Sequence, residues 1–305
     1  MTRTRWLGIP RGLAGAGLML ALTGIAFHGR DHWILPAMIY YATPWLPRLG
    51  AGLLAVIVLR PRWQRVVAAT CAVISLLEGW RSFRADPVPP SPPAGPVVSV
   101  WNAARGLDSL EWRWEELGQA DISAVVETGT FPAADWGRFT AASPDHEWKR
   151  FDASTMLGVR GKILSHEALG VDGRFRCHRV LVTLPEHGEL TVVVADVRSQ
   201  PWISREQAMA GILRAAGDDP RAIILGDFNT PPESVWFREW KDRGFTLAND
   251  GPRRGFRETW AFGLPLLTLD QIWLAPGWRS VGCTLHRGDS DHARVVCNLE
   301  FSRGP

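Results

Sequence analysis

The sequence predicts an α+β fold in which packed β-sheets are covered by helices. Short apolar segments rich in β-branched residues recur after residue 97, two of them are joined by a tight turn, and helical patterns are few. The chain has 305 residues, of which 46% are hydrophobic, enough for one large core or two smaller ones. The first third follows another pattern and is predicted to form a separate helical region.

Three apolar segments, residues 13–27, 49–59 and 66–77, characterise that first third. Each is near or below the roughly 20 apolar residues that a membrane-spanning helix needs, so buried core helices are the alternative. Pairs of glycines within the segments and tryptophans at their ends favour close helix packing in a bilayer. We therefore predict about three transmembrane helices within residues 1–84. A cleaved signal peptide would explain only the first segment.

Arginine placement predicts the orientation of these segments. Three arginines precede the first segment and three more lie between the second and the third, and such clusters stay on the cytoplasmic side. Three spans then place the rest of the chain outside the cytoplasm. Prolines and Arg48 interrupt the region before the second segment, and with only two spans the large domain would be cytoplasmic.

Charge and proline content separate the two parts of the chain. Residues 1–86 carry ten arginines and three acids, a net charge of +7, whereas residues 87–305 carry a net charge of −4. The larger part therefore lacks the broad basic surface of a duplex-DNA binder. Residues 85–96 contain six prolines and are predicted to be an extended spacer or a disordered tether. We expect three parts: 1–84, the linker 85–96, and a large domain, 97–305.

The elements of the large domain follow from local patterns. Apolar runs predict strands, residues 179–197 predict a hairpin around Pro-Glu-His-Gly, and residues 204–216 predict a helix with Ser204 as its N-cap. Two shorter helices are expected at 110–117 and 234–243. The expected strands outside the hairpin are 97–101, 121–127, 222–229, 266–275, 280–288 and 293–301.

Polar residues of similar chemistry are predicted to lie where these apolar strands end. Each alone is explained by a turn, but together they indicate a site, because ligands bind where strand ends meet in one crevice. The residues are Asn102, Glu127, Asp196, Asp227, Asn229, Asp270, Asp291 and His292.

This residue set suits a hard divalent cation such as Mg²⁺, which prefers oxygen ligands and binds beside substrate phosphates. His292, next to Asp291, is a candidate general base or electrostatic clamp. The four cysteines form neither a CxxC pair nor a Cys/His cluster, which argues against a structural zinc. One disulfide among Cys177, Cys283 and Cys297 remains open.

Five motifs occur in order: VWNAARG, VVETGT, ILGDFNT, LDQIWL and SDHARV. With them the sequence resembles the endonuclease/exonuclease/phosphatase superfamily, also called DNase I-like, over about residues 97–301. The preceding apolar segments are similar to those of a membrane-anchored bacterial branch. The resemblance implies a four-layer sandwich of two face-to-face β-sheets with helices outside, and Mg²⁺- or Mn²⁺-dependent cleavage of a phosphoester.

The resemblance also implies roles for the motif residues. Glu127 corresponds to the main metal ligand, supported by Asn102 and Asp291. Asp227 would position or deprotonate the attacking water, and Asn229 would hold that water or the phosphate.

His292 would then contact the scissile phosphate, while Asp270 accepts a hydrogen bond from its ring and fixes its tautomer.

Two departures from the family pattern concern phosphate recognition. Many members carry His where this chain has Asp196, and an acid cannot replace an imidazolium, although it can add a metal ligand or share a proton with the phosphate. The only tyrosines, Tyr40 and Tyr41, lie outside the large domain, so a family tyrosine near the phosphate has no counterpart. Arg179 is the candidate cation for the phosphate; the alternative is a surface charge on an edge strand.

The expected function is that of a membrane-anchored, metal-dependent phosphodiesterase or phosphatase acting outside the cytoplasm. Its substrate would be a lipid headgroup, a nucleotide-like molecule or nucleic acid. No protein partner is expected. A nuclease of the same superfamily and a non-catalytic binding protein that kept the fold are the alternatives, because a fold alone does not decide function.

Overall fold

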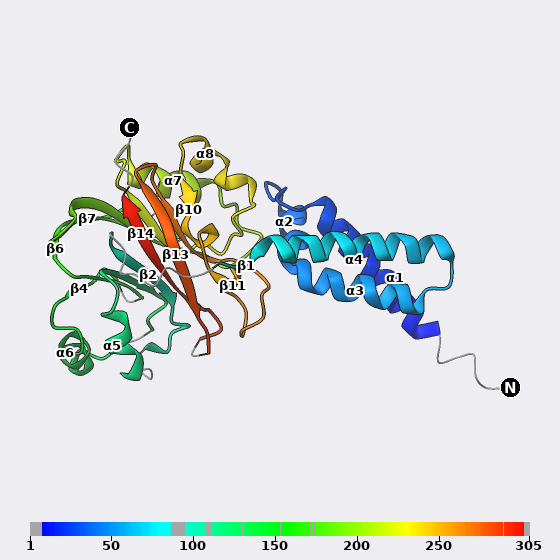
Figure 1. Cartoon of the computed structure of the whole chain (residues 1–305), viewed down its shortest axis with the longest axis horizontal. Helices are drawn as coiled ribbons and strands as arrows, with labels where there is room; N and C mark the ends of the chain where they lie inside the picture. Colours follow the sequence, from blue (N-terminus) through cyan, green and yellow to red (C-terminus); the bar gives the residue numbers. More distant parts are fainter. Residues whose placement is uncertain are drawn as a thin grey trace. The chain divides into compact units, whose positions relative to one another are not determined.

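The chain divides into two units, which are described separately (Figure 1). The computed structural model describes residues 8–86, 95–107, 111–129, 131–152, 154–170, 173, 175–288 and 290–301. Most of the predicted linker, residues 87–94, lies outside this range. The helical unit comprises Met1–Arg84, Gln200–Ser204 and Glu233–Trp236. The two-sheet unit comprises Ala85–Ser199, Arg205–Pro232 and Phe237–Pro305.

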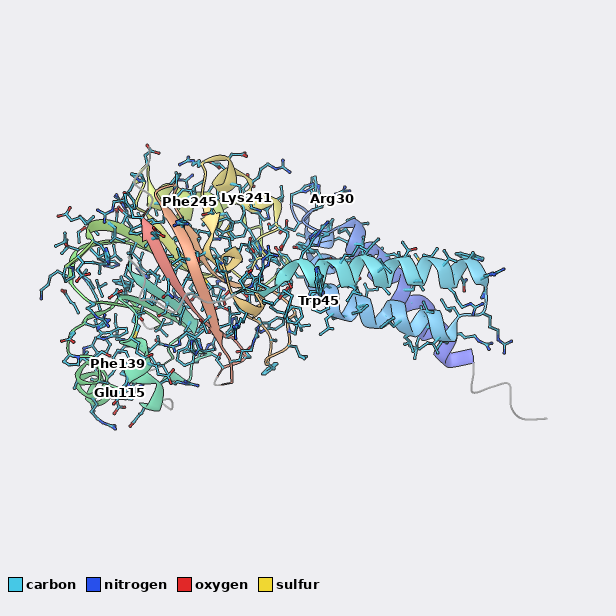
Figure 2. All side chains as sticks on the ribbon, in the orientation of Figure 1. Arg30, Trp45, Glu115, Phe139, Lys241 and Phe245 are labelled. Atoms are coloured by element: carbon cyan, nitrogen blue, oxygen red, sulfur yellow. A yellow bond between two sulfur atoms is a disulfide. The ribbon has the colours of Figure 1, made fainter. Side chains whose placement is uncertain are left out.

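Small residues bring the helices of the helical unit close together. A Cβ atom added to Gly52 would lie 3.0 Å from the carbonyl oxygen of Ala68. Gly79 likewise leaves no room for a Cβ atom, because the buried ring of Trp45 packs directly against it (Figure 2). Pro44 separates the second helix from the third, because proline disfavours helical geometry in the residue before it. The helices are α1 (Gly8–Ala26), α2 (Ile34–Ala42), α3 (Trp45–Val58) and α4 (Arg62–Ser82).

Polar side chains of the helical unit face inward. Arg48, which interrupts the apolar pattern of the sequence, is buried in α3 and pairs with Glu78 of α4. His28 lies 3.2 Å from the same carboxylate. The buried Asp31 accepts a hydrogen bond of 2.6 Å from the Tyr41 hydroxyl. The unit therefore has an interior with charged pairs.

The outer surface of the helical unit is apolar. Of the 23 exposed large hydrophobic side chains in the described part of the chain, 18 belong to residues 13–83. No described helix is long and apolar enough to cross a membrane alone, and α2 with α3, bent by 73°, meets that criterion only as a pair. The expected three transmembrane helices are therefore not supported: the first and second apolar segments form short helices, and α4 includes Arg62, Arg65 and Glu78.

Two six-stranded mixed sheets form the other unit. Strands β2 and β3 are parallel, as are β8 and β9, and the other pairs are antiparallel. The first sheet has the order β13 (Trp278–His286), β14 (Arg294–Phe301), β2 (Val97–Asn102), β3 (Ile122–Val126), β5 (Thr155–Val159) and β4 (Glu147–Arg150). The second has the order β10 (Thr246–Leu247), β12 (Asp270–Leu274), β9 (Ile223–Asp227), β8 (Gly188–Val197), β7 (Phe175–Leu184) and β6 (Lys162–Ala168).

The main core lies between the sheets. Alternate residues of each strand point into it, as the two-residue period of a strand requires. Val98 and Val100 of the first sheet belong to one buried cluster with Val192, Val194 and Leu225 of the second. The polar residues that continue these inward-facing series at the strand borders therefore also lie between the sheets.

Helices cover the outer faces of both sheets. Against the first sheet, Trp101, Trp114, Phe139 and Met156 form a second buried cluster, in which Phe139 belongs to α6 (Figure 2). Helix α7 packs against β7, β8 and β9 of the second sheet. These layers confirm the predicted α+β fold of two packed sheets flanked by helices. The helices are α5 (Trp114–Leu117), α6 (Ala133–Ala141), α7 (Glu206–Ala216) and α8 (Arg238–Asp242).

Every predicted strand of the large domain corresponds to an observed one, with shifted ends. The hairpin is confirmed as β7 and β8, but β7 begins at Phe175 rather than at residue 179. Strand β12 begins at Asp270, so this residue starts a strand instead of lying within one. The sequence patterns did not predict β4, β5 and β6 or the short strands β1 (Phe83–Ala85), β10 and β11 (Arg254–Phe256).

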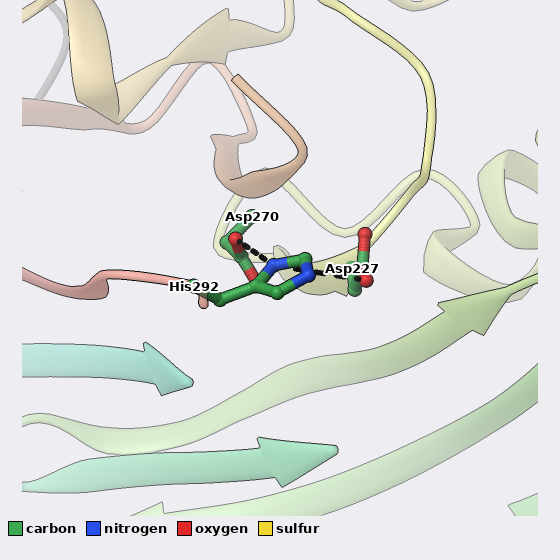
Figure 3. Close-up of side chains that lie close together, drawn as sticks. All are labelled: Asp227, Asp270 and His292. Carbon is green, nitrogen blue, oxygen red and sulfur yellow. Dashed lines mark hydrogen bonds and ion pairs between the residues drawn. The ribbon is translucent and has the colours of Figure 1, made fainter. Parts of the chain in front are cut away.

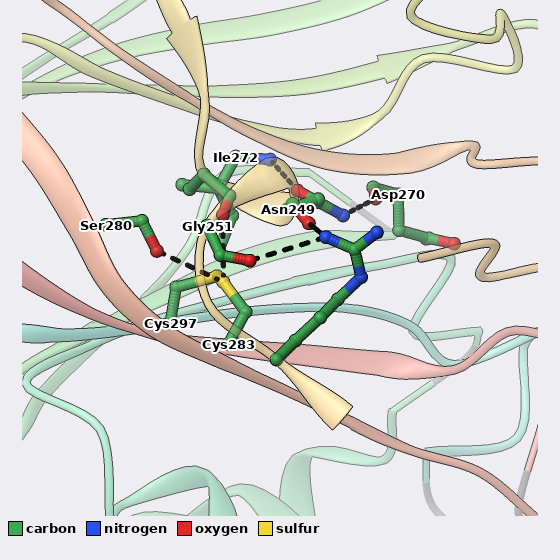
Figure 4. Close-up of a disulfide and its surroundings, with 9 residues drawn as sticks. Asn249, Gly251, Asp270, Ile272, Ser280, Cys283 and Cys297 are labelled. Carbon is green, nitrogen blue, oxygen red and sulfur yellow. Dashed lines mark hydrogen bonds between the residues drawn. A yellow bond between two sulfur atoms is a disulfide. The ribbon is translucent and has the colours of Figure 1, made fainter. Parts of the chain in front are cut away.

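A disulfide joins Cys283 of β13 to Cys297 of β14, which face each other in register (Figure 4). The nearby side chain of Asn249 donates a hydrogen bond to the Asp270 carbonyl and accepts one from the amide of Ile272, each 3.1 Å long. It thereby fixes the start of β12. Cys177, the third candidate for pairing, is a buried free thiol.

Candidate functional site

One row of four directly opposed residues crosses the second sheet at the candidate site. Asp270 of β12 lies opposite Asp227 of β9, which lies opposite Asp196 of β8, which lies opposite Arg176 of β7. Opposed residues on neighbouring strands share a face of the sheet. The row therefore brings three carboxylates together and ends on an arginine.

Asp227 is the central acid of this row and is completely buried. Its carboxylate accepts hydrogen bonds from the Asn102 amide at 2.8 Å, the backbone amide of Asn229 at 2.9 Å and the side-chain amide of Asn229 at 3.1 Å. Burial raises the pKa of Asp227 to about 7; the charges of Asp270 and Asp196 add to the rise, while His292 opposes it. Asp227 therefore changes protonation state near neutral pH.

His292 and Asp270 form a buried ion pair beside Asp227 (Figure 3). Nδ1 of His292 lies 2.8 Å from Oδ2 of Asp270 and 4.0 Å from Oδ2 of Asp227. Burial alone would lower the pKa of His292, but the surrounding carboxylates, Asp270 foremost, outweigh it and raise the pKa to about 10. The imidazole is therefore a cation at neutral pH, and the contact with Asp270 agrees with the partnership that the family resemblance implied.

Asn102 and Glu127 end two neighbouring strands of the first sheet. The amide of Asn102 bridges the sheets through Asp227, and its Oδ1 accepts a hydrogen bond from the backbone of Ala104. Glu127 has a left-handed φ of 49°, as does Asn229 with 47°. Such values are uncommon outside glycine and often mark functional positions. Glu127 is partly exposed and lies 3.5 Å from Arg105.

Asp291 is held by Trp260, whose indole N–H donates a hydrogen bond of 3.0 Å to Oδ2. Its neighbour Ser290 donates to the carbonyl of Asn102 at 2.9 Å and accepts from the amide of His292 at 3.1 Å. These contacts tie the segment before β14 to the end of β2. They place Asp291 and His292 at the same edge as Asn102, although both precede their strand rather than end it.

Asp196, one of the two expected departures from the family pattern, is paired with Arg176 of the neighbouring strand. The Arg176 guanidinium donates to Asp196 at 2.6 Å and lies 3.5 Å from Asp152, which follows β4 of the first sheet. Burial raises the pKa of Asp196 to about 6 against the effect of Arg176, with Glu127 and Asp152 contributing to the rise. Arg176 therefore offsets the charge of the Asp196 carboxylate.

Arg179 lies apart from this site. Residues 176, 178 and 180 of β7 face the core, so Arg179 points to the opposite face of the sheet. There it lines a groove with Phe175, Gly211 and Arg214 beside α7. Arg179 was named as the candidate cation because the predicted hairpin began four residues late, at residue 179, and the sequence pattern did not assign the two faces of β7.

The described residues fit a hard divalent cation. One group of three brings possible ligand atoms within 4.8 Å of one another, namely Asp227, Asp270 and His292. A histidine ligand must be neutral, so the protonated His292 suits a phosphate better than a metal. Besides Asp227 and Asp270, the carboxylates of Asp291 and of the partly exposed Glu127 are oxygen donors. The buried Oδ1 of Asp270 has no hydrogen-bond partner among the described residues. Oxygen donors of this kind suit Mg²⁺ or Mn²⁺.

The sequence matches the endonuclease/exonuclease/phosphatase family over residues 78–292, which is more than half of the chain. The chain belongs to the endonuclease/exonuclease/phosphatase family. This membership confirms the resemblance carried by the five sequence motifs. The family consists of phosphoester hydrolases that generally depend on divalent metals. No curated protein matches the sequence.

Solved structures share the fold at low sequence identity. A functionally unknown conserved protein from Enterococcus faecalis V583 is 13% identical with a TM-score of 0.51, covering 68% of this chain and all of its own. An endonuclease/exonuclease/phosphatase from Beutenbergia cavernae DSM 12333 is 15% identical with a TM-score of 0.50, covering 68% of this chain and 72% of its own. The inositol polyphosphate 5-phosphatase domain of SPsynaptojanin reaches a TM-score of 0.39 at 12% identity, covering 68% and 86%.

Sequence reasoning missed three residues that contact the site: Arg176, Asp152 and Trp260. Arg176 shares its sheet face with the core-facing Val180 and Val182, so the alternation of β7 was the available signal. Asp152 follows a short polar strand that lacks an apolar pattern. Nothing in the sequence distinguishes Trp260 from the other tryptophans of the domain; only its hydrogen bond to Asp291 does so.

Proposed function

We propose that the chain is a divalent-metal-dependent phosphodiesterase or phosphatase that hydrolyses its substrate with an activated water. One observation carries this proposal. A buried acid whose pKa is about 7, Asp227, lies 4.0 Å from a cationic imidazole, His292, at the edge where both sheets contribute polar residues. A carboxylate that can take up a proton near neutral pH, beside an imidazolium that stays charged there, suits phosphoester hydrolysis by an activated water.

Each residue of the cluster has a distinct role in this proposal. Asp227 accepts the proton of the attacking water, and Asn229 orients the water or the phosphate. His292 donates to a phosphate oxygen, where its charge offsets the charge that develops during cleavage. Asp270 keeps the imidazole protonated and holds its ring in place.

Glu127, Asn102 and Asp291 are the residues proposed to hold the metal ion. Bound there, a divalent cation would polarise the phosphoryl group and lower the pKa of a water. Asp291 and Asn102 already have hydrogen-bond partners that orient them, Trp260 and Ala104 respectively.

Hydrolysis of bis-p-nitrophenyl phosphate by the full chain, purified in mild detergent, tests this function. We expect release of p-nitrophenolate with Mg²⁺ or Mn²⁺, loss of release with EDTA, and recovery when metal is restored. No release from this diester or from the monoester p-nitrophenyl phosphate, with either metal, would refute the proposal and favour a binding protein that kept the fold. Cleavage of plasmid or single-stranded DNA with no action on phospholipid would identify a nuclease. The net charge of −4 over residues 87–305 disfavours nucleic acid as the substrate.

We also propose that the helical unit binds a lipid bilayer. The concentration of exposed apolar side chains on α1 to α4, with charged pairs inside, supports this, because soluble proteins rarely expose large apolar patches. The full chain is expected to co-sediment with cell membranes and to resist extraction by alkaline carbonate. Recovery in the soluble fraction would contradict this.

The two-sheet unit is proposed to act outside the cytoplasm. The Cys283–Cys297 disulfide supports this placement, because disulfides persist in oxidising compartments. An alkaline-phosphatase reporter fused after Pro305 is expected to be active. Activity at the same position of a reporter that works only in the cytoplasm would overturn the placement.

A further inference from the structure

The side chain of Arg176 is held at the edge of the site by acids from both sheets. Nη1 donates to the buried Asp196 of the second sheet at 2.6 Å, and Nε lies 3.5 Å from Asp152, in the turn between β4 and β5 of the first sheet. Because Asp196 and Asp152 belong to different sheets, the guanidinium bridges the edge of the sandwich. Two fixed contacts on one planar group define its orientation.

The outer part of this guanidinium remains available. The side chain of Arg176 is 52% exposed, whereas that of Asp196 is 6% exposed. An arginine has five N–H donors, and Nη2 of Arg176 has no hydrogen-bond partner among the described residues. The group can therefore keep both acidic partners and still donate to an oxyanion that enters from solvent.

A chain of aromatic and histidine contacts supports the acid that holds Nε. Asp152 accepts from the amide of Ser154 at 2.7 Å and lies 3.1 Å from Nε2 of His178. Nδ1 of His178 lies 3.1 Å from His166, and Phe151 stacks on both imidazoles. Such support fixes Asp152 and, through it, the guanidinium; a surface arginine needs no such arrangement.

The row across the second sheet gives the position of Arg176 relative to the chemistry. Asp227 has the cationic His292 on one side, and Arg176 lies two strands away on the other. Neighbouring strands are about 4.8 Å apart, so the Cα atoms of Asp227 and Arg176 are separated by roughly 10 Å. Arg176 is therefore placed for a group beside the scissile phosphoester.

We propose that Arg176 binds a second anionic group of the substrate, next to the phosphoester that is cleaved. The substrate class is then a phosphoester that carries a further phosphate or carboxylate one to two strand spacings away, roughly 5–10 Å. Asp196 acts as a positioning residue that holds Arg176. This inference rests on the proposed function, and it gives the buried Asp196 a role beside the site.

Two matched substrates test the inference: thymidine 5′-(p-nitrophenyl phosphate) with and without a 3′-phosphate. The full chain is expected to prefer the 3′-phosphorylated ester in kcat/KM. In the Arg176→Ala variant this preference is expected to fall tenfold or more, mainly through KM, and Arg176→Lys should retain part of it. Arg179→Ala, which changes the same residue type on the opposite face of β7, should keep both the rates and the preference.

An equal loss for both esters in Arg176→Ala would overturn the inference, because Arg176 would then act only by holding Asp196. If that variant does not fold, Arg176→Lys decides, and an unchanged preference in it overturns the inference. If the unmodified chain cleaves neither ester, the proposed function fails by itself. Binding of thymidine 3′,5′-bisphosphate then tests Arg176: a tenfold weaker binding in the variant supports the inference, and equal binding rejects it.

Discussion

Asp196 lies directly opposite Asp227 on the parallel strands β8 and β9, so two buried carboxylates are neighbours on one face of the sheet. Asp270 extends the row on the other side of Asp227. The charges of Asp270 and Asp196 add to the raised pKa of Asp227, and nearby cations offset this concentration of negative charge. His292 and Arg176 supply them from the two sides.

Activity should depend on pH through Asp227 and His292. The raised pKa of Asp227, about 7, means that the acid is protonated and unable to accept a proton below that pH. The raised pKa of His292, about 10, means that the imidazole stays cationic until well above neutrality. We expect kcat/KM for bis-p-nitrophenyl phosphate to rise through pH 7 and to decline only towards pH 10. A maximum near pH 5 would contradict these roles.

Replacing Asp270 with Asn should remove the negative charge that keeps His292 protonated. The pKa of His292 should then fall from about 10 towards its ordinary value, which NMR titration of the imidazole measures. Activity at pH 8 should fall on the order of 100-fold, the usual contribution of a positioned acid or base. Asp250→Asn, which removes a half-exposed partner of Arg257, is the control and should change neither quantity. An unchanged pKa of His292 would disprove the dependence on Asp270.

Gly226 should tolerate no side chain, because a Cβ atom there would lie 1.8 Å from the carbonyl oxygen of Ala195. Gly226→Ala must push β9 away from β8 and disturb Asp227, so we expect unfolding or a large drop in melting temperature. Gly217→Ala is the matched comparison. Gly217 also has positive φ but has no atom within 4 Å, so its replacement should cost only the backbone strain, about 1–3 kcal/mol. Equal melting temperatures for the two variants would contradict the crowding at Gly226.

Removing the disulfide should weaken the two-sheet unit. The Cys283–Cys297 bond closes a separation of 14 residues, and a loop of this length stabilises by about 3 kcal/mol through the unfolded state. The double variant Cys283→Ala/Cys297→Ala should lose roughly that free energy of unfolding in urea. Cys177→Ala, at a buried free thiol, serves as a control for the loss of sulfur packing. If the double variant unfolds no earlier than this control, the disulfide makes no contribution.

Much of the site could be predicted because strand borders are visible in the sequence. The apolar runs before Asn102 and Asp227 mark two strands whose ends meet at one edge, and the hydrogen bond between these side chains confirms that they meet. The Asp270–His292 contact followed from the family motifs. These predictions succeeded because local pattern and family chemistry agree at those positions.

Other features depend on packing that no local pattern reveals. The choice between Arg176 and Arg179 depends on which face of β7 meets the core, and a shift of one residue in a strand reverses the faces. Strand β6 is mostly exposed and β4 is polar, so neither shows an apolar run. In the helical unit, the inward position of Arg48 became clear only from its pair with Glu78.

The central claim is that Asp227 accepts a proton during metal-dependent hydrolysis. The most direct test compares initial rates of bis-p-nitrophenyl phosphate hydrolysis by the unmodified chain and by Asp227→Asn at pH 8 in Mg²⁺, with circular dichroism to confirm that both are folded. The side-chain amide cannot take up the proton, so we expect a fall in kcat on the order of 10²- to 10⁴-fold. A folded Asp227→Asn variant that retains the full rate would contradict the account.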